Sequence, residues 1–419
     1  MGSMSNSYEH FKAPSFQNTL LAFFRICCLL GVTPSSWNVS VINPIPKTEG
    51  ATTIDKFRPI SLTLMIRRTF EKFFLGHLLE SDASKLHHTQ AGFRNGFSTL
   101  THALVADDCA IRGQKYRVFY DFAQAYDTVP VPLLLSKMKT RGASAQILSL
   151  VDALFVGTST KVIVNGRQTE SIPLSRGLLQ GSILSPLLFD IFIDDLAHKL
   201  NKDTPDPKKI PRALLYADDI TAGSHALHHL QVTSNDLVDW CHENGMTINL
   251  AKCGVVGLTH GDRDLVLRGI GPIPRVECYN YLGFPYKSRG IDWAEHLKSM
   301  ALKASKTLKF CEARGNSKWS AGLRLALYRA FVRSRMEYGA GIMYHWIQND
   351  SKSRTEHLKA IATVQDAALK WIFGVQGPYK GYSLISCLAN YLRAILRLGL
   401  PPYGPLYWNG WEQPSKNPP

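Results

Sequence analysis

Short apolar runs alternate along this chain with longer segments in which apolar residues recur at helical spacing. In residues 214–223 two adjacent acids, Asp218 and Asp219, lie between short apolar runs. This pattern is typical of two strands joined by a tight turn. In residues 117–121 a second apolar run ends at Asp121, which predicts a buried strand followed by a turn. Both segments therefore present carboxylates at strand ends, away from hydrophobic side chains.

Helical periodicity predicts helices over much of the remaining chain. We expect them at residues 20–32, 62–80, 99–112, 144–155, 186–196, 319–346 and 356–373, and from Pro130 onward. Another is expected after a capping box at Asp292 and Glu295, with Lys298, Lys303, Lys306 and Lys309 along it and Leu297, Ala301, Ala304 and Leu308 facing inward. The segment at 20–32 is apolar but contains Arg25 and is much shorter than the roughly 20 residues of a membrane span, so it predicts a buried helix. Between Lys161 and Ile172, the Asn165-Gly166 pair predicts a hairpin with a type I′ turn.

Charge and cysteine content narrow the class of partner and the compartment. The 48 Lys and Arg residues exceed the 33 Asp and Glu residues, giving a net charge of +15. Such an excess favours a polyanionic partner, nucleic acid before a membrane surface. The eight cysteines include no Cys-x-x-Cys pair, which favours free thiols in a reducing compartment over disulfides or structural zinc. We expect an intracellular, nuclear protein that is neither secreted nor membrane-spanning.

The adjacent acids at 218 and 219 have two interpretations. Neighbouring carboxylates on a stiff turn repel each other, and a shared divalent cation such as Mg²⁺ relieves the repulsion. Taken alone, the pair is better explained by a solvated turn. Asp121 on a separate strand changes the balance, because carboxylates from different strands can bridge two metals about 3.5–4 Å apart in nucleotidyl transfer. Together the two segments predict a polymerase.

These segments also carry a resemblance. Tyr-Ala-Asp-Asp at 216–219, with Tyr-Asp-Phe-Ala-Gln-Ala-Tyr-Asp at 120–127, resembles the catalytic core of reverse transcriptases, particularly those of non-LTR (LINE-like) retrotransposons. The resemblance implies an α+β right-hand polymerase with fingers, a palm containing an antiparallel sheet, and a helical thumb. It implies that Asp121, Asp218 and Asp219 are catalytic and hold two Mg²⁺ ions, for which Mn²⁺ is a possible substitute.

The resemblance covers roughly residues 36–402 and divides the chain into five regions. They are an N-terminal extension at 1–35, fingers at 36–113, a palm at 114–285 with further fingers elements near 130–172, a helical thumb at 286–376, and a C-terminal extension at 377–419.

Several residues are implied to bind the incoming deoxynucleotide. They are Lys47, Arg58, Phe122, Tyr126, Gln180 and Gly181. Lys47 and Arg58 match the fingers residues that clamp the triphosphate, a role that suits a mobile ammonium and a forked guanidinium; Lys47 as a solvated loop residue is the alternative. Tyr126 stands at the position of the aromatic steric gate against a 2′-hydroxyl, with an ordinary core tyrosine as the alternative.

Other residues are implied to contact the template, the primer or the leaving group. The template and primer contacts are Arg94, Tyr216, Tyr281, Leu282, Gly283, Lys303 and Lys306. Arg94 belongs to a fingers motif that begins at Gln90, residues 278–284 resemble the primer-grip hairpin, and the two lysines lie on a basic thumb helix. Lys252 matches a lysine near the leaving pyrophosphate, and is a candidate proton donor or charge stabiliser.

Three further clusters of polar residues are predicted to lie on solvent-exposed helix faces. Asp107 and Asp108 repeat the Ala-Asp-Asp triplet, but their neighbours have helical spacing, so we expect a solvated helix face. We expect the same for Asp190, Asp194 and Asp195 on the helix after Pro186. His225, His228 and His229 have spacing that could bind metal, yet no Glu general base accompanies them, and a solvated helix face is again expected.

The sequence therefore predicts an RNA-directed DNA polymerase that extends a primer 3′-hydroxyl with dNTPs on an RNA template, through an RNA–DNA hybrid. No endonuclease, RNase H or zinc-knuckle segment is recognised, so a partner endonuclease in trans is possible. One alternative is a polymerase that copies DNA or uses ribonucleotides. A catalytically silent nucleic-acid-binding scaffold is the other, which the intact acids disfavour. Tyr126, where this branch usually has Phe, and Phe119-Tyr120 before Asp121 depart from the family pattern.

Overall fold

The structure is a computed structural model that describes residues 13–202, 210–315, 319–343 and 351–374. The side chains of residue 55 and residues 351–357 are outside this description. The C-terminal extension expected at 377–419, and the first twelve residues of the N-terminal extension expected at 1–35, therefore lie outside the described residues. The described chain divides into two compact units. The first contains residues 13–99, 116–202 and 211–275, and the second contains residues 100–115, 276–315, 319–343 and 351–374.

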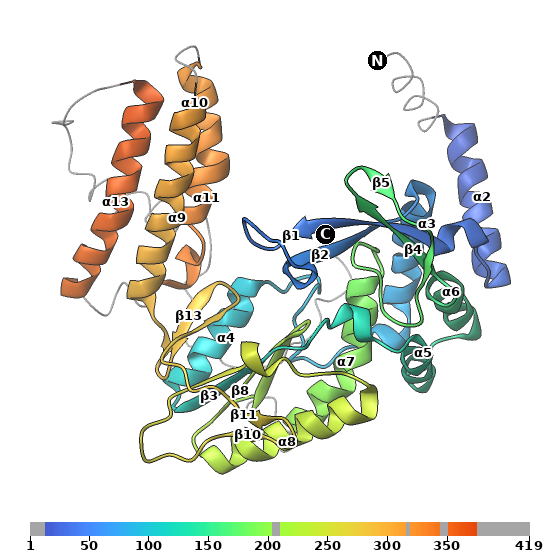
Figure 1. The fold of residues 1–419 in the computed structure, drawn as a ribbon, viewed down its shortest axis with the longest axis horizontal. Helices are drawn as coiled ribbons and strands as arrows, with labels where there is room; N and C mark the ends of the chain where they lie inside the picture. Colours follow the sequence, from blue (N-terminus) through green and yellow to red (C-terminus); the bar gives the residue numbers. More distant parts are fainter. Residues whose placement is uncertain (1–12, 203–209, 316–318, 344–350, 375–419) are drawn as a thin grey trace, which may run out of the picture. The chain divides into compact units, whose positions relative to one another are not determined.

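A four-stranded antiparallel sheet forms the centre of the first unit, in the order β7-β8-β3-β9. Its strands are β3 Tyr116–Tyr120, β7 Ala213–Tyr216, β8 Asp219–Ser224 and β9 Gly254–Val256. The side chains of β3 are all buried, including that of Arg117, which agrees with the buried strand predicted there. Helices α7 (Ser185–Asn201) and α8 (Leu227–Asn244) pack against this sheet (Figure 1).

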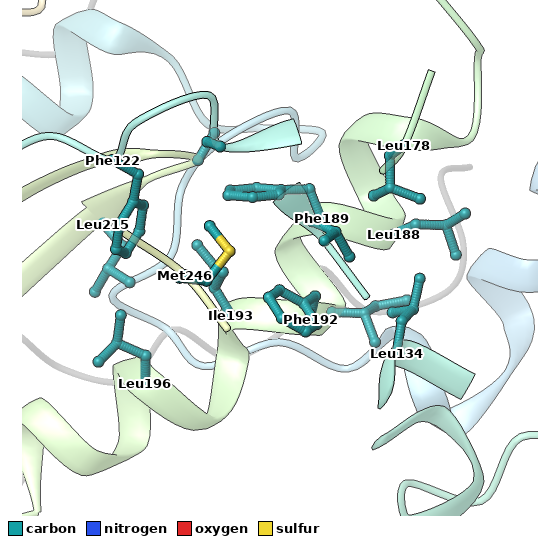
Figure 2. Packing of buried hydrophobic residues seen from close by; sticks show 14 of the residues in the cluster. Phe122, Leu134, Leu178, Leu188, Phe189, Phe192, Ile193, Leu196, Leu215 and Met246 are labelled. Atoms are coloured by element: carbon teal, nitrogen blue, oxygen red, sulfur yellow. The ribbon is translucent and has the colours of Figure 1, made fainter. Parts of the chain in front are cut away.

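The main hydrophobic core lies between this sheet and its helices. Phe122, Leu215, Ile193 and Met246 meet there and are at most 6% exposed. Figure 2 shows these side chains gathered close to Phe192 of α7. Helices α5 (Val131–Thr140) and α6 (Ala145–Phe155) extend the core, and α6 begins where the Ser144 hydroxyl accepts a hydrogen bond from the Ile147 amide.

A second sheet in the same unit has the order β2-β1-β4-β5, with β6 also pairing with β4. Its strands are β1 Val39–Pro46, β2 Phe57–Leu62, β4 Ser159–Val164, β5 Arg167–Gln168 and β6 Ile172–Pro173. Strands β1 and β4 run parallel, and the other pairs are antiparallel. Asn165 and Gly166 have φ values of 51° and 76°, which confirms the predicted type I′ hairpin. Further elements of the unit are α2 Pro14–Leu30, α3 Met65–Glu80, β10 Val266–Leu267, β11 Gly271–Pro272 and the 3₁₀ turns η1 Ser35–Asn38, η2 Ile54–Lys56, η3 Asp82–Ser84, η4 Tyr126–Thr128 and η5 Leu250–Lys252.

The second unit combines a small sheet with a group of helices. Its elements are α4 Thr99–Ile111, β12 Tyr279–Tyr281, β13 Phe284–Lys287, β14 Gly290–Ile291, α9 Trp293–Arg314, α10 Ala321–Leu327, the π-helical turn η6 Tyr328–Arg333, α11 Ser334–Met336 and α13 Ser351–Phe373. Helices α9, α10, α11 and α13 lie side by side (Figure 1). In α9 the residues expected to face inward, Leu297, Ala301, Ala304 and Leu308, are all buried.

Predictions about burial were wrong in three places: at Asp107, in helix α7 and in helix α2. Asp107 is buried rather than solvated, and its Oδ1 accepts a hydrogen bond from the Ile291 amide at 2.7 Å. Asp190 and Asp194 of α7 are also buried, at 1% and 0% exposure, because this helix is covered on more faces than its apolar stripe indicates. Helix α2 is buried only along the side containing Phe24 and Cys27.

Other expectations about polar residues agree with the structure. Asp108 pairs with Arg112 at 2.7 Å on the surface, and the Asp195 side chain is half exposed. His225, His228 and His229 are exposed, as expected of a solvated helix face. All seven cysteines in the described ranges are free. None of the helices described combines the length and apolar character needed to cross a bilayer.

Candidate active site

Strand register brings the three predicted catalytic acids to one end of the central sheet. Tyr120 pairs with Ile220, so Asp121, the next residue, emerges beside Asp219 at the start of β8. Tyr216 pairs with Asp219, which leaves Ala217 and Asp218 as the two-residue turn between β7 and β8. The predicted hairpin is therefore present, and it lies next to the end of β3 as the polymerase hypothesis requires.

Lys252 joins this cluster. It ends the turn η5, and its Nζ lies 2.9 Å from Oδ2 of Asp121. The amide of Asn249 donates a hydrogen bond to the Asp121 carbonyl at 2.8 Å, and the Ala123 amide donates to the Thr247 carbonyl at the same distance. These backbone bonds fix the lysine segment against the loop after β3. The predicted catalytic set Asp121, Asp218, Asp219 and Lys252 is thus assembled by the fold.

Electrostatics within the cluster favour a bound cation. Burial and the charge of Asp121 raise the pKa of Asp218. The Asp219 side chain has solvent-exposed surface, yet the surrounding protein and the charges of Asp218 and Asp121 raise its pKa to about 6. Lys252 opposes both shifts. Because neighbouring carboxylates contribute to the raised pKa of Asp218 and Asp219, a bound cation at this site would be favourable.

The donor chemistry fits a divalent ion. Carboxylate oxygens are the hard ligands that Mg²⁺ and Mn²⁺ prefer, and Asp121 and Asp218 come from separate rigid strands with Asp219 adjacent. Within the described residues, no three acidic, His or Cys side chains already form a ready-made ligand set. The Lys252 ammonium is the positive charge that lies next to the Asp121 carboxylate.

The candidate steric gate has a well-fixed ring. Tyr126 stacks on Phe189 of α7, with ring centroids 4.7 Å apart. Its hydroxyl is buried and has no hydrogen-bond partner among the described residues. Burial and the charges of Asp218 and Asp190 raise its pKa, so the phenol stays neutral.

Gln180 and Gly181 form a braced loop near the gate. The side-chain amide of Gln180 donates hydrogen bonds to both carboxylate oxygens of Asp127, at 2.9 and 3.1 Å. The backbone carbonyl of Gln180 accepts a hydrogen bond from the Ser61 amide at 2.6 Å. Gly181 has a φ of 128°, and a Cβ there would lie 2.5 Å from the Ser61 carbonyl oxygen. Only glycine fits this approach, which agrees with a backbone that closely borders a ligand site.

The Phe122 side chain lies in the hydrophobic core of the first unit. Its side chain is 3% exposed and lies in the core (Figure 2), and its ring packs against Trp240, with ring centroids 6.1 Å apart. The ring is part of the core, so the nucleotide contact expected of Phe122 stays a prediction and would involve its backbone.

The two candidate phosphate clamps lie on the second sheet. Arg58 is exposed on β2 opposite Ile45 of β1. Lys47 follows β1 directly and is exposed, and its amide donates to the Lys56 carbonyl at 2.8 Å. Its positive charge lowers the pKa of Asp127 against the larger, opposite effect of burial. Both cations therefore project from adjacent ends of one antiparallel strand pair.

Arg94 turns toward its own loop. Its Nη1 donates to the carbonyls of His87 and Gln90 at 2.9 and 2.6 Å, and its guanidinium lies 4.5 Å from the Phe97 ring centroid. The side chain remains half-buried, so template contact through it stays a prediction. Tyr216 is also half-buried, at the last position of β7.

The second unit contains the remaining predicted contacts. Residues 279–287 form the expected hairpin, with Leu282 and Gly283 in its turn at φ values of 49° and 83°. The Tyr281 ring, however, is 2% exposed, and its hydroxyl lies 3.1 Å from Nε2 of His102. Contact between this ring and a primer would require exposure that it lacks, and only the turn remains accessible. Lys303 and Lys306 are exposed on α9.

A buried ion pair that the sequence did not reveal supports the Gln180 loop. Arg67 Nε lies 2.8 Å from Oε1 of Glu71, and both side chains are fully buried. Oε2 of Glu71 accepts hydrogen bonds from the Ser182 hydroxyl and the Ile183 amide, at 2.9 and 2.8 Å. The only sequence signal was a charged i, i+4 pair on a helix, which usually indicates an exposed face.

Comparison with known proteins now identifies the family. A family model described as reverse transcriptase (RNA-dependent DNA polymerase) matches residues 45–286, more than half of the chain. The chain belongs to the reverse transcriptase family. Reverse transcriptases have the right-hand polymerase fold and use divalent metal ions in DNA synthesis, so the predicted fold class is confirmed and a divalent ion is part of the family's chemistry.

Curated relatives narrow the branch. The RNA-directed DNA polymerase from mobile element jockey of Drosophila melanogaster is 27% identical over 85% of this chain and 40% of its own length. A Pol polyprotein from the type-1 retrotransposable element R2 of Popillia japonica is 27% identical over 46% of this chain and 36% of its own. The predicted resemblance to non-LTR retrotransposon reverse transcriptases is confirmed. The chain spans about 40% or less of these relatives' length.

Solved structures of telomerases are also similar. An apo telomerase from Candida Tropicalis covers 93% of this chain and 73% of its own at 13% identity, with a TM-score of 0.44. A Candida albicans telomerase in complex with a telomeric RNA fragment covers 86% of this chain and 66% of its own at 12% identity, with a TM-score of 0.46.

Proposed function

We propose that this reverse transcriptase chain extends a primer 3′-hydroxyl with deoxynucleotides on an RNA template. The observation that carries the proposal is the convergence of Asp121 with the Asp218 turn at one sheet end, with Lys252 paired to Asp121. A silent scaffold would have no need for a cluster of acids in which neighbouring carboxylates raise the pKa of Asp218 and Asp219. The scaffold alternative is therefore not favoured.

The catalytic roles follow from these positions. Asp121, Asp218 and Asp219 would hold Mg²⁺, proposed as two ions and replaceable by Mn²⁺, which supplies the positive charge that acidifies the 3′-hydroxyl and stabilises the leaving pyrophosphate. Lys252 lies within reach of the same carboxylates and can deliver a proton or a positive charge to the departing phosphate.

The nucleotide side of the site is formed by residues of the first unit. Lys47 and Arg58 supply positive charge for a triphosphate from adjacent strand ends. Tyr126, held by its stack on Phe189, excludes a 2′-hydroxyl, and Gln180 with Gly181 borders the base pair through a braced loop. We propose that Phe122 acts through its backbone alone.

The proposed partners are an RNA template, a DNA primer or the resulting hybrid, and dNTPs. Lys303 and Lys306 on the exposed side of α9 suit a sequence-independent phosphate contact, as does Arg94 on the template side. Tyr216 and the Leu282-Gly283 turn are proposed to hold the primer end. We keep the division into fingers, palm and thumb as a proposal, together with a nuclear location and a separate endonuclease in trans.

Primer extension tests the proposal. The purified chain is given a labelled DNA primer on an RNA or a matching DNA template, with dNTPs or rNTPs and Mg²⁺. We expect dNTP-dependent extension on RNA, and a loss of about 10³-fold or more in Asp218→Ala, because several kcal/mol of transition-state stabilisation are removed. Asp152→Ala, at an exposed acid of α6, is the matched control.

Hybrid binding separates the alternatives. Asp218→Ala should bind an RNA–DNA hybrid within about twofold of wild type, since the contacts to phosphate lie elsewhere. Binding without extension on any template by the wild-type chain would support the silent scaffold and contradict the proposal. Equal use of ribonucleotides would contradict the role of Tyr126.

A further inference from the structure

A short segment of the fingers motif runs alongside the catalytic hairpin. Strand β7 is an edge strand of the central sheet, and residues 89–91 pair with it. The Leu215 amide donates to the Thr89 carbonyl at 3.0 Å, and the Ala91 amide donates to the Leu215 carbonyl at 2.9 Å. Gln90 and Leu215 form a parallel bridge. This segment therefore covers the open edge next to Asp218.

The side chain of Gln90 then contacts the catalytic turn itself. It is fully buried. Its Oε1 accepts hydrogen bonds from the Ala217 amide at 3.0 Å and the Gly92 amide at 2.9 Å. Ala217 immediately precedes Asp218, so a single side-chain oxygen ties the start of the turn to the segment at 90–92.

The turn needs such support because its backbone is strained. Ala217 has a φ of 52°, a left-handed conformation that costs free energy in any residue other than glycine. Strained conformations persist only where surrounding contacts over-determine them. The hydrogen bond from the Ala217 amide to Gln90 is one such contact, and it acts on the residue that carries the strain.

Gly92 supports the turn by close packing. A Cβ at position 92 would lie 2.4 Å from the Ala217 nitrogen and 3.0 Å from its Cα. These are backbone atoms, which cannot move aside without moving the turn. The absence of a side chain at Gly92 therefore sets how closely the segment approaches Ala217.

We propose that Gln90, together with Gly92, is a positioning element that holds the Ala217-Asp218 turn in the conformation required to bind the divalent ion. The inference rests on the proposed function, since it assumes that Asp218 is a metal ligand. It assigns the first half of the motif to the catalytic turn and leaves Arg94, whose guanidinium bonds to the same loop, as the candidate template contact.

Metal binding and extension by matched variants test this role. Gln90→Met keeps the side-chain length but removes the acceptor, Gln90→Glu keeps an acceptor, and Gly92→Ala adds the obstructing Cβ. Gln168→Met, at an exposed position of β5, is the control. Mn²⁺ affinity is measured by calorimetry or paramagnetic resonance, the Mg²⁺ activation constant by single-turnover extension, and fold by hybrid affinity.

We expect Gln90→Met and Gly92→Ala to weaken Mn²⁺ binding and raise the Mg²⁺ activation constant by about tenfold. Gln90→Met leaves the amides of Ala217 and Gly92 without their acceptor, and Gly92→Ala places a Cβ against the Ala217 backbone. Hybrid affinity should stay within about twofold, and Gln90→Glu should recover at least half of the loss. Unchanged Mn²⁺ affinity in Gln90→Met would overturn the inference, as would a loss of hybrid affinity with metal binding retained.

Asp218→Ala distinguishes failure of this inference from failure of the proposed function. If Asp218→Ala leaves Mn²⁺ binding intact, the metal site itself is wrong. If Asp218→Ala abolishes Mn²⁺ binding while Gln90→Met does not change it, only the positioning role of Gln90 is wrong.

Discussion

Lys252 Nζ lies 2.9 Å from Oδ2 of Asp121, one of the predicted metal ligands. The lysine side chain is 62% exposed, whereas that of Asp121 is 17% exposed. Its ammonium therefore approaches the cluster from the solvent side and lowers the pKa of Asp218 and Asp219. From this position the ammonium can stabilise the negative charge that develops on the leaving pyrophosphate during the reaction.

Lys252→Met should slow single-turnover extension by about 10²-fold at saturating dNTP, the usual contribution of a positioned acid. Lys252→Arg keeps the charge but does not release a proton at neutral pH, so it should recover only part of the rate. Lys199→Met, which disrupts another pair at Glu243, is the control. A Lys252→Met rate within twofold of wild type would contradict any role in the chemical step.

Metal affinity should fall as the pH is lowered through about 6. The pKa of Asp219 is raised to about 6 by burial and by Asp218 and Asp121, and a protonated carboxyl does not bind metal well. Calorimetric Mn²⁺ titrations between pH 5 and 7.5 should show an affinity that drops by up to about tenfold per pH unit below 6. Asp219→Asn should flatten this dependence, and an unaltered slope in that variant would assign the titration to another group.

The raised pKa of Asp219 should also make the stability of the metal-free chain depend on pH. A folded pKa of about 6 lies above the roughly 3.9 of a free aspartate, so folding favours the protonated form of Asp219. Stability should therefore decrease as the pH rises from about 4 to about 6. Addition of Mn²⁺ at pH 7 should restore it, because a ligand that binds only the folded chain stabilises it.

Local patterns in the sequence predicted the hairpins and the acids that meet at one end of the central sheet, but not which polar residues are buried. The Asn165-Gly166 turn and the Tyr-Ala-Asp-Asp hairpin depend on adjacent residues alone. Oδ1 of Asp107 accepts a hydrogen bond from the Ile291 amide, 184 residues away, and Oε1 of Gln90 accepts one from the Ala217 amide, 127 residues away. Helical periodicity identifies the apolar face of a helix, and it carries no information about a distant backbone amide that makes burial of a carboxylate tolerable.

Asp190 should make the chain less stable as the pH rises. It is 1% exposed, and neither carboxylate oxygen has a hydrogen-bond partner among the described residues. Burial raises its pKa well above the ordinary value, with Asp194 and Asp218 adding to the shift and Arg94 opposing it. Ionisation in the folded state is therefore costly, and the cost grows with pH above about 4.

Asp190→Asn should remove this dependence. Relative to wild type, its free energy of unfolding should rise with pH by up to about 1.4 kcal/mol per unit until Asp190 ionises in the folded chain. Urea unfolding at pH 5, 6 and 7 measures the difference. Asp152→Asn, at an exposed acid, should show no such trend, and parallel curves for wild type and Asp190→Asn would contradict the prediction.

Breaking the buried ion pair of Arg67 and Glu71 should lower the free energy of unfolding by several kcal/mol. Arg67 also donates to the carbonyls of Trp37 and Leu154, at 2.6 and 3.0 Å, so Glu71→Leu leaves a buried cation without its counter-charge. We expect a loss of about 3–5 kcal/mol in the free energy of unfolding. Asp108→Asn, which breaks the exposed pair with Arg112, should cost less than about 1 kcal/mol. Equal effects in the two variants would show that burial of the first pair is unimportant.

Tyr126 should exclude ribonucleotides through its ring rather than its hydroxyl. The ring is fixed against Phe189 with centroids 4.7 Å apart, and the hydroxyl makes no hydrogen bond with the described residues. Tyr126→Phe should therefore keep the preference for dNTP over rNTP and match or slightly exceed the wild-type stability, since an unsatisfied buried group is removed.

Tyr126→Val removes the ring and opens space where a 2′-hydroxyl would otherwise collide. The ratio of kcat/KM for dNTP over rNTP should fall by at least about tenfold, with most of the change in the rNTP value. Hybrid affinity checks that the cavity, which costs about 2–4 kcal/mol of stability, has not unfolded the site. If Tyr126→Phe lost selectivity as fully as Tyr126→Val, discrimination would depend on the hydroxyl, and the steric account of the gate would be wrong.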